Sequence, residues 1–291
     1  MTMLNRLYDN PDLLVHDYLC RNRSAAAGME EFCDRHEIAF PRTGLYVKHL
    51  GRERVLADPN QILFFNRGEA YRVSHPLEGG DRSTTIWVKD DDLRDLLGGA
   101  GGLGRPFART HLPCSPRAAL LHRRLLVLLA AKGHDGVAIQ ETVFDLLEAA
   151  VAGSLSQQIP ATRPLRQATR RDHRDLAFAA QTVLNERFHA PLTLRAIATT
   201  VGSSTYHLSR IFHRETGLPV HRYLNRLRLR ATLERLADGE PDLTDLALSV
   251  GFSDHSHFTN AFRGEFGIPP SRFRALATAS RIRQTSKNLQ A

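Results

Sequence analysis

The chain has 291 residues, 42% of them hydrophobic, and a formal net charge of +8 at pH 7. This length suits two domains that each bury a core, and no run of about 18 apolar residues is present that could cross a bilayer. The N-terminal segment lacks the apolar core of a signal peptide, and three dispersed cysteines (Cys20, Cys33 and Cys114) argue against a disulfide framework. We therefore expect a cytoplasmic protein.

The positive charge belongs to the C-terminal part of the chain. From Ala161 onward there are 20 Lys and Arg against 11 Asp and Glu, whereas the preceding residues hold 19 basic and 20 acidic side chains. Such a split suggests a polyanionic partner for one domain, although basic surfaces are often simply solvated.

Residues 12–88 alternate between short apolar runs and turn clusters. QILFFN, YRVSH and TTIWV are rich in β-branched and aromatic residues, and Gly, Pro, Asn and Asp gather between such runs. Several short strands at this spacing predict an antiparallel sandwich or barrel. The glycine-rich stretch 98–106 then predicts a flexible connection, because no Lys-Ser/Thr of a phosphate-binding loop follows it.

Two amphipathic helices are predicted over residues 115–131 and 137–156. In the second, apolar residues recur at helical spacing, at Val143, Leu146, Leu147 and Ala150. The pair packs either on the strands of its own chain or against a second chain in a homodimer. The candidate dimerisation face consists of Leu121, Leu125 and Leu128.

Residues 157–171 contain two prolines, several arginines and no acidic residue, so they are interpreted as an interdomain linker. The helical region that follows contains an internal repeat. Val201-Gly202 recurs as Val250-Gly251, and LSRIFHRETG (208–217) recurs as FTNAFRGEFG (258–267). In each unit a short helix leads through a Val-Gly turn into a second helix, and glycine can adopt the positive φ that the turn needs. Each unit therefore predicts a helix-turn-helix, whose second helix can lie in a DNA major groove.

One long helix is predicted between the two units, over residues 219–239. Arg222, Arg226 and Arg230 repeat every four residues on a face beside its apolar stripe. A helix of about 18 residues is about 27 Å long. That length suits two DNA-reading helices held roughly one duplex turn, about 34 Å, apart.

Residues 172–279 resemble the DNA-binding domain of the AraC/XylS family of transcription regulators. The resemblance rests on LRAIATTVG, HLSRIFHRETG, GFSDHSHFTNAF and GIPPSRFR. It implies a monomeric module with both second helices in successive major grooves of one double-stranded DNA site, and an N-terminal sensor. RNA polymerase is a further candidate partner. FPRTGLYVKHLG and DPNQILFFNRGEAYRVSHP resemble, more loosely, the cupin-type sensor and dimerisation region of such regulators.

The expected fold is a two-domain α+β chain. Residues 1–157 are predicted to form a cupin-like antiparallel β-barrel with two helices, for sensing or dimerisation. Residues 158–171 are the predicted linker, residues 172–280 an all-α tandem helix-turn-helix domain, and residues 281–291 a flexible tail.

The outer faces of the two second helices supply the predicted base contacts. Arg210 can donate two hydrogen bonds to guanine, unless it forms only a surface ion pair, and Tyr206 can pack on a thymine methyl group. Family members often carry Arg where this chain has Asn260, which can pair with adenine instead. Arg226 is predicted to contact phosphate. The full set is Thr205, Tyr206, Ser209, Arg210, Arg226, His255, Ser256, Thr259 and Asn260.

Strand alternation also selects candidate contacts to an unidentified small-molecule effector inside the barrel: Arg42, Tyr46, Phe64, Tyr71, His75 and Trp87. No catalytic residue, cofactor or metal site is predicted. His255 and His257 would share a face in a strand, but they diverge by about 200° in a helix. Cys33 and His36 are interpreted as belonging to an ordinary loop.

The sequence thus predicts a ligand-responsive, sequence-specific transcription regulator, either an activator or a repressor. The alternative from another class is a cupin-type metal-dependent enzyme with an accessory DNA-binding domain. The missing His-x-His-plus-Glu cluster argues against it. In a third interpretation the barrel only mediates dimerisation.

Overall fold

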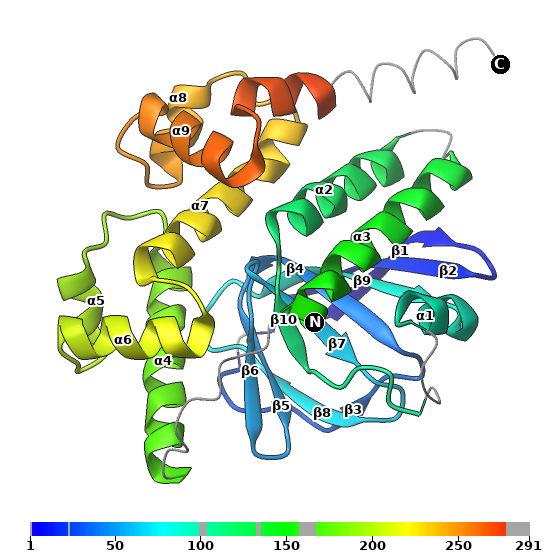
Figure 1. Ribbon diagram of the computed structural model, residues 1–291, viewed down its shortest axis with the longest axis horizontal. Coiled ribbons are helices and arrows are strands. Elements are labelled where there is room, and N and C mark those ends of the chain that lie inside the picture. Colours follow the sequence, from blue (N-terminus) through cyan, green and yellow to red (C-terminus); the bar gives the residue numbers. More distant parts are fainter. Residues whose placement is uncertain (1, 23, 99–103, 132–134, 157–166, 278–291) are drawn as a thin grey trace.

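The computed structural model describes residues 2–22, 24–98, 104–131, 135–156 and 167–277 of the chain. An N-terminal domain of antiparallel sheets and helices precedes a C-terminal domain of helices only (Figure 1). Residues 158–166 of the predicted linker and the predicted tail, 281–291, lie outside the described residues. The remainder of the predicted linker differs from expectation, because helix α4 begins at Gln167.

The N-terminal strands form two sheets. The larger has the order β1-β2-β9-β4-β7-β10, with bounds Thr2–Asp9, Leu13–Cys20, Asp81–Val88, Glu37–Gly44, Gln61–Phe65 and His111–Pro113. The smaller has the order β3-β8-β5-β6, with bounds Glu31–Phe32, Ala70–Ser74, Tyr46–Leu50 and Glu53–Ala57. The antiparallel β-domain is therefore confirmed. The closed barrel is not, because the described strands hydrogen-bond within two separate sheets.

The strand period of two explains how the larger sheet is buried on both faces. On β7, Ile62 and Phe64 belong to the main core beneath the helices, whereas Leu63 and Phe65 belong to a cluster facing the smaller sheet. All four side chains are at most 7% exposed. The sheet therefore has one face for the helices and one face for the space between the sheets.

Helices α1 (Asp90–Leu96), α2 (Pro116–Ala130) and α3 (Gly136–Ser156) follow the sheets. Helix α2 begins as predicted: Pro116 is its first residue, and the Ser115 side chain accepts a hydrogen bond from the Ala118 N–H at 3.1 Å. Leu125 and Leu147 are fully buried in the core that these helices share with the larger sheet. The pair thus packs on its own chain.

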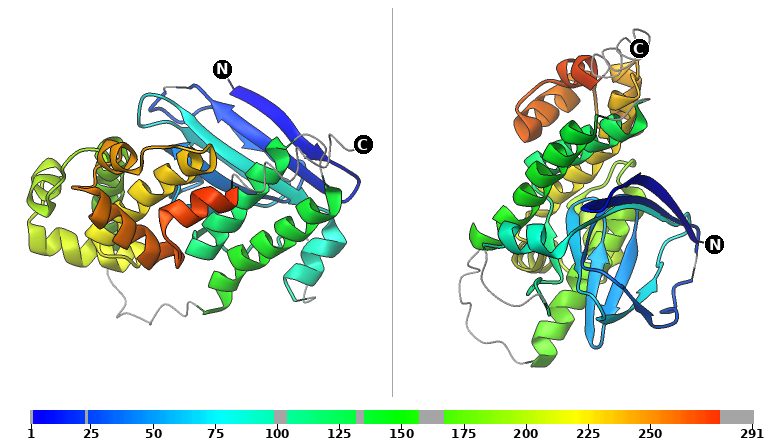
Figure 2. Two further views of the ribbon diagram at one scale, coloured as in Figure 1. Left: turned by 90° about the horizontal axis from the view of Figure 1, so that it is seen from above. Right: turned by 90° about the vertical axis from the view of Figure 1, so that its right-hand side faces the viewer.

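The C-terminal domain is built around α7 (Figures 1 and 2). Its helices are α4 (Gln167–Arg187), α5 (Leu194–Thr200), α6 (Thr205–Thr216), α7 (Val220–Ala237), α8 (Leu243–Ser249) and α9 (His255–Phe266), and residues 270–277 are also helical. The first half of α7 packs with α4–α6. Its second half packs with α8, α9 and, through the main core, α2. Among the described residues, no helix is long and apolar enough to span a membrane.

Candidate nucleic-acid interface and ligand cavity

The first helix-turn-helix unit consists of α5 and α6. The Ser204 side chain begins α6 by accepting a hydrogen bond from the His207 N–H at 3.2 Å. Gly202, with φ at 64°, forms the turn before it. The inner face of α6 is fully buried at Leu208, Ile211 and Phe212. This packing fixes which face of α6 is presented to solvent.

The second unit, α8 and α9, repeats this construction. Asp254 begins α9 by accepting a hydrogen bond from the His257 N–H at 2.7 Å, and this bond lowers the pKa of the Asp254 carboxyl. Gly251, with φ at 93°, forms the turn. The inner face of α9 is buried at Phe258, Phe262 and Phe266. Two similar units therefore lie at the two ends of α7 (Figure 1).

The predicted base-contacting residues lie on the outer faces of α6 and α9. Tyr206 is 77% exposed, which is unusual for a large aromatic side chain without a partner surface. Ser209 and Thr259 are half-buried, and the others are exposed: Thr205, Tyr206, Arg210, His255, Ser256 and Asn260. Both faces thus offer hydrogen-bonding side chains to solvent.

The two histidines of α9 contact different residues. The Nδ1 of His257 lies 3.1 Å from the Ser253 hydroxyl, and its ring packs edge-on against Phe252. The Nε2 of His255 lies 3.4 Å from the Thr259 hydroxyl. These contacts agree with a helix that turns the two imidazoles away from each other.

The arginines of α7 mostly face inward. Arg226 forms an ion pair with Glu265 of α9 at 2.8 Å, and its side chain is only 20% exposed. Arg230 is 8% exposed and donates to the side-chain oxygen of Asn60 and the carbonyl of Cys114 in the N-terminal domain. Arg222 alone of the predicted row is exposed. The phosphate contact predicted for Arg226 stays a prediction, and it would require the Glu265 pair to open.

Arg228 holds the two units together. Its guanidinium donates to the carbonyls of Phe188 and Ala190, just beyond α4, at 2.7 and 2.9 Å. The Gly251 turn lies against the same segment, because a Cβ built there would be 2.8 Å from the Phe188 carbonyl oxygen. The two units therefore contact each other through Arg228 and the segment after α4.

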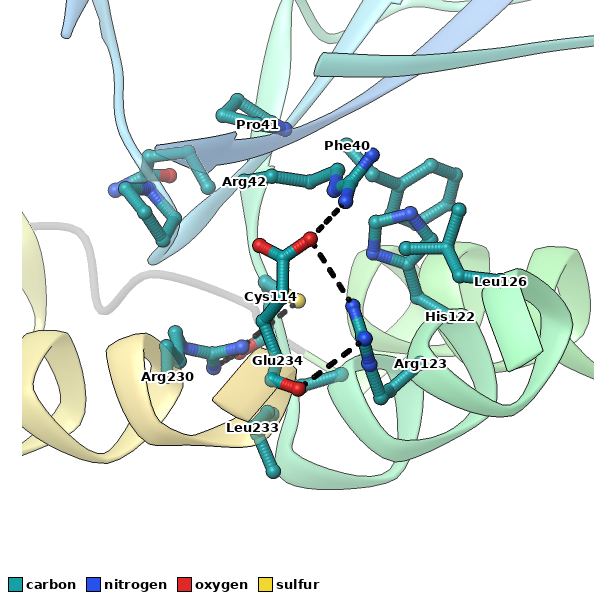
Figure 3. Close-up of a pocket in the computed structure, with 13 residues that line it drawn as sticks. Phe40, Pro41, Arg42, Cys114, His122, Arg123, Leu126, Arg230, Leu233 and Glu234 are labelled. Carbon is teal, nitrogen blue, oxygen red and sulfur yellow. Dashed lines mark hydrogen bonds and ion pairs between the residues drawn. The ribbon is translucent and has the colours of Figure 1, made fainter. Parts of the chain in front are cut away.

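A cluster of charged residues joins the two domains. Glu234 of α7 forms ion pairs with Arg42 of β4 and Arg123 of α2, and Arg42 also pairs with Asp17 at 3.0 Å. Figure 3 shows Arg42 and Arg123 pointing at Glu234 across a small pocket of about 50 Å³. His122 lines the same pocket, and burial together with nearby arginines lowers its pKa well below the usual value. Arg42, predicted as an effector contact, thus lies at the domain interface.

A second interdomain contact centres on Asp58, which is fully buried. Its carboxylate accepts hydrogen bonds from the Tyr223 hydroxyl of α7 and from Asn185 of α4, the latter at 2.7 Å. Burial raises the pKa of Asp58. The Tyr223 hydroxyl in turn accepts a hydrogen bond from Gln181 at 3.0 Å. Helix α7 therefore contacts the N-terminal domain at both ends of its buried face.

A larger cavity of about 410 Å³ lies between the two sheets. Of the six predicted effector contacts, Tyr46, Tyr71 and His75 line it. Phe64 packs on Phe107 in the main core instead, and Trp87 lies beneath the guanidinium of Arg35 at 4.6 Å. Neither residue lines the cavity, because strand alternation alone does not tell which face of the sheet bounds it.

Cavity residues that the sequence did not reveal include Glu37 and Cys33. Burial raises the pKa of Glu37 to about 7, with a smaller contribution from the neighbouring Asp34. Burial also raises the pKa of Cys33 to about 11, and its sulfur lies 3.7 Å from the Tyr71 hydroxyl. Neither residue belongs to a motif, and only the folded sheets bring them to the cavity.

The predicted dimerisation face is only partly accessible. Leu125 is fully buried inside the chain, so it cannot also contact a second chain in this fold. Leu121 and Leu128 are half-buried against the same core. Dimerisation through α2 stays a prediction for these two residues. The sequence also left several exposed arginines of the C-terminal domain unassigned, among them Arg195, Arg263 and Arg272, which suit phosphate contacts.

Comparison with known proteins places the similarity in the C-terminal domain. Residues 197–276 match a protein family described as a helix-turn-helix domain. The HTH-type transcriptional activator RhaS of Escherichia fergusonii is 38% identical over 97 residues, which make up 33% of this chain and 35% of that protein. RhaS of Escherichia coli is 38% identical over 91 residues, 31% of this chain and 33% of that protein. The match spans about a third of the length of these relatives.

Solved structures give a similar picture. A transcriptional regulator from Chromobacterium violaceum, described as AraC-type, is 28% identical and covers 36% of this chain and 93% of its own, with a TM-score of 0.34. ToxT from Vibrio cholerae is 12% identical and covers 90% of this chain and 98% of its own, with a TM-score of 0.36.

Proposed function

We propose that the protein is a sequence-specific transcription regulator of the AraC/XylS family, controlled by a small molecule. The match of residues 197–276 to a helix-turn-helix domain family and the 38% identity to RhaS over 97 residues support this proposal. The outer faces of α6 and α9 would enter successive major grooves of one DNA site. The cavity between the sheets would bind the effector. No catalytic step is part of this proposal.

One observation carries the DNA-binding part. Two matched units lie at the two ends of α7, each with a packed inner face and an exposed outer face of hydrogen-bonding side chains. A lone helix pair with a glycine turn occurs in many proteins, but two in tandem on one rigid helix suit a DNA duplex. The excess of arginine over acidic residues in this part of the chain supports binding to phosphate.

The effector part is supported by how the domains meet. Helix α7 carries both DNA-reading units, and it is also the helix that contacts the N-terminal domain through Tyr223, Arg230 and Glu234. Arg42 of β4 and Asp17 of β2 link this interface to strands whose other residues line the cavity. A ligand that shifts these strands would therefore shift the support of α7.

The experiment is a selection of binding sites by the full chain from a pool of random duplex DNA. We expect enrichment of one motif with two base-specific blocks about one helical turn apart. A reporter gene behind the selected site then gives the direction of regulation. Enrichment of no motif by a folded protein would contradict the proposed function, and a single block would contradict the use of both units.

A matched control variant removes one positive charge outside the two units. Arg124 is an exposed arginine on α2, a helix that belongs to neither unit. Arg124→Ala and Arg210→Ala remove the same charge, but only the second should change the selected motif. Candidate effectors are then screened by their effect on affinity for that motif. If no cavity-binding compound changes the affinity for DNA, this result supports the alternative in which the N-terminal domain only mediates dimerisation.

A further inference from the structure

Three potential metal ligands meet at one end of the cavity between the sheets: Cys20, His75 and Asp81. One ligand atom of each lies within 4.8 Å of the others, and the residues are 3%, 4% and 3% exposed. Cys20 is the last residue of β2, Asp81 is the first residue of β9, and His75 follows β8. Cys20 and His75 lie 55 positions apart in the sequence, so no short motif indicates the cluster.

The backbone around the cluster is held closely. Cys20 and Asp81 are direct partners in the β2–β9 ladder, and Asp81 also pairs with Gly44 of β4. A Cβ on Gly80 would lie 2.0 Å from the Cys20 carbonyl oxygen, and one on Gly44 would lie 2.1 Å from that of Gly80. Two glycines thus permit an approach that any side chain would block. The donors are therefore positioned by the fold before a ligand arrives.

Two buried polar atoms of the cluster have no hydrogen-bond partner among the described residues. The Nε2 of His75 lies 2.9 Å from one carboxylate oxygen of Asp81, which leaves the Nδ1 of His75 and the second oxygen of Asp81 unpaired. Leaving such groups buried and unsatisfied is unfavourable, by roughly 1–3 kcal/mol each.

The cavity gives a cation a route to the cluster. His75 and Asp81 both line it, and so do three further carboxylates, those of Glu31, Asp34 and Glu37. Only two arginines, Arg6 and Arg35, offset them. A cavity whose lining carries more acidic than basic groups raises the local concentration of cations.

We propose that Cys20, His75 and Asp81 bind a divalent transition-metal ion of the zinc class. Sulfur, nitrogen and oxygen donors together suit zinc, which takes four ligands at about 2.0–2.3 Å. Separations within 4.8 Å close to such a site with small side-chain movements. Three protein donors leave the fourth position to a water molecule or to a group of a ligand in the cavity. This proposal does not depend on DNA binding.

The test uses the full chain without an affinity tag, stripped with a chelator and dialysed. Zinc is titrated in competition with a chromogenic chelator, and Co²⁺ is titrated separately while the near-ultraviolet spectrum is recorded. We expect one equivalent of tightly bound zinc, and a cobalt–thiolate charge-transfer band that zinc abolishes. A water molecule in place of the metal predicts neither, so failure to bind one equivalent of zinc overturns the proposal.

Variants assign the site, because the chain has only three cysteines. Cys20→Ser should remove the cobalt band and raise the Kd for zinc by more than about 100-fold. Losing a residue that only contacts a metal ligand already weakens binding by up to about 100-fold, and losing a ligand should cost more. Cys33→Ser, also in the cavity wall, and Cys114→Ser should retain both. If Cys20→Ser does not fold, Asp81→Asn takes its place. This variant should retain the cobalt–thiolate band but bind zinc more weakly. A band lost in Cys33→Ser or Cys114→Ser instead contradicts the proposal.

Discussion

Arg210 and Asn260 occupy comparable places on the outer faces of α6 and α9, yet they present different chemistry to DNA. A guanidinium donates only, and its fork fits the two acceptors on guanine, whereas a carboxamide both donates and accepts and fits adenine. Both residues are exposed, and each lies two positions after the first buried residue of its helix. The two units should therefore prefer different base pairs.

For Arg210→Ala, we expect binding to the selected site to weaken by about 1–3 kcal/mol and preference at one base pair to relax. The helix should remain folded, because its inner face and its Ser204 cap are unchanged. Affinity is measured against a panel of sites with single base substitutions. An equal loss on every site would indicate a phosphate contact rather than base recognition.

For Asn260→Ala, we expect relaxed preference at a different base pair, about one helical turn from the first. The loss in affinity should also be about 1–3 kcal/mol, because one bidentate contact is removed. The same panel measures both variants, and Arg124→Ala is again the control. Relaxation at the same base pair in both variants would contradict the arrangement of α6 and α9 in successive grooves.

Glu37 is a residue of the cavity whose protonation should influence stability near neutral pH. Its folded pKa of about 7 lies above the ordinary value of 4.5, so the folded chain binds the proton more tightly than the unfolded chain. Stability therefore increases as the pH falls through 7, and the cost of a buried charge is fully present above it.

Glu37→Gln should thus be more stable than the wild type by about 1–3 kcal/mol at pH 8. The difference should become small near pH 4, where the wild-type Glu37 carboxyl is mostly protonated in both the folded and the unfolded chain. Urea unfolding at the two pH values measures it. Glu31→Gln is the matched control, because Glu31 lines the same cavity but is exposed. A less stable Glu37→Gln at pH 8 would show that the carboxylate has a favourable partner in solution.

At the scale of elements, the two helix-turn-helix units have the same turn but different surroundings. Gly202 has φ at 64° and no atom within 4 Å of an added Cβ. Gly251 has φ at 93°, and an added Cβ would lie 2.8 and 2.9 Å from the carbonyl oxygens of Phe188 and His189. The second turn is thus part of the contact between units, whereas the first is open to solvent.

Gly202→Ala should therefore cost only the strain of a left-handed backbone, about 1–2 kcal/mol. Gly251→Ala should cost about 1–3 kcal/mol more, because the segment after α4 must move. Unfolding free energies measure the difference. Footprinting should show that Gly251→Ala also loses protection at the second block of the DNA site. Equal costs for the two variants would mean that the contact at Phe188 yields without penalty.

Elements with a strong period were predictable from the sequence, and contacts between elements were not. The N-cap of α2 at Ser115 and the buried positions of α6 and α9 follow from local pattern. Strand β1 lies at the sheet edge with β2 as its neighbour, and most of its side chains are exposed, so it lacks the apolar alternation of a buried strand. Helix α1 spans only seven residues, which is too short for a clear helical period. The inward turn of Arg226 and Arg230 was also hidden, because a basic residue every four positions suits a solvated face equally well.

At the scale of the whole molecule, α7 contacts three parts of the structure. Its buried residues contact the first unit, the second unit and the N-terminal domain, so few faces remain for solvent. The main core continues from the sheets through α2 to α9. The domains should therefore unfold together. A substitution that weakens the Asp58–Tyr223 contact should lower the unfolding free energy of the whole chain.

Tyr223→Phe tests this coupling, because it removes only the hydroxyl that donates to the buried carboxylate of Asp58. We expect a loss of about 1–3 kcal/mol in unfolding free energy at pH 7, in a single transition. Burial already raises the pKa of Asp58 in the folded chain, and losing a donor to its charged form raises it further. Below the pKa of Asp58 in the unfolded chain, its carboxyl is protonated in both the folded and the unfolded state. The loss of unfolding free energy in Tyr223→Phe should therefore become smaller as the pH falls.

The matched control is Tyr206→Phe, which removes the same hydroxyl from a side chain that is 77% exposed. Its unfolding free energy should equal that of the wild type at every pH, because water replaces the lost partner. Chemical denaturation from pH 4 to pH 8, followed by fluorescence and circular dichroism, compares the two variants. A Tyr223→Phe penalty that stays constant with pH would show that the hydroxyl contributes independently of the charge of Asp58, as its hydrogen bond with Gln181 would. Two separate transitions in that variant would show instead that this single hydrogen bond is what makes the domains unfold as one.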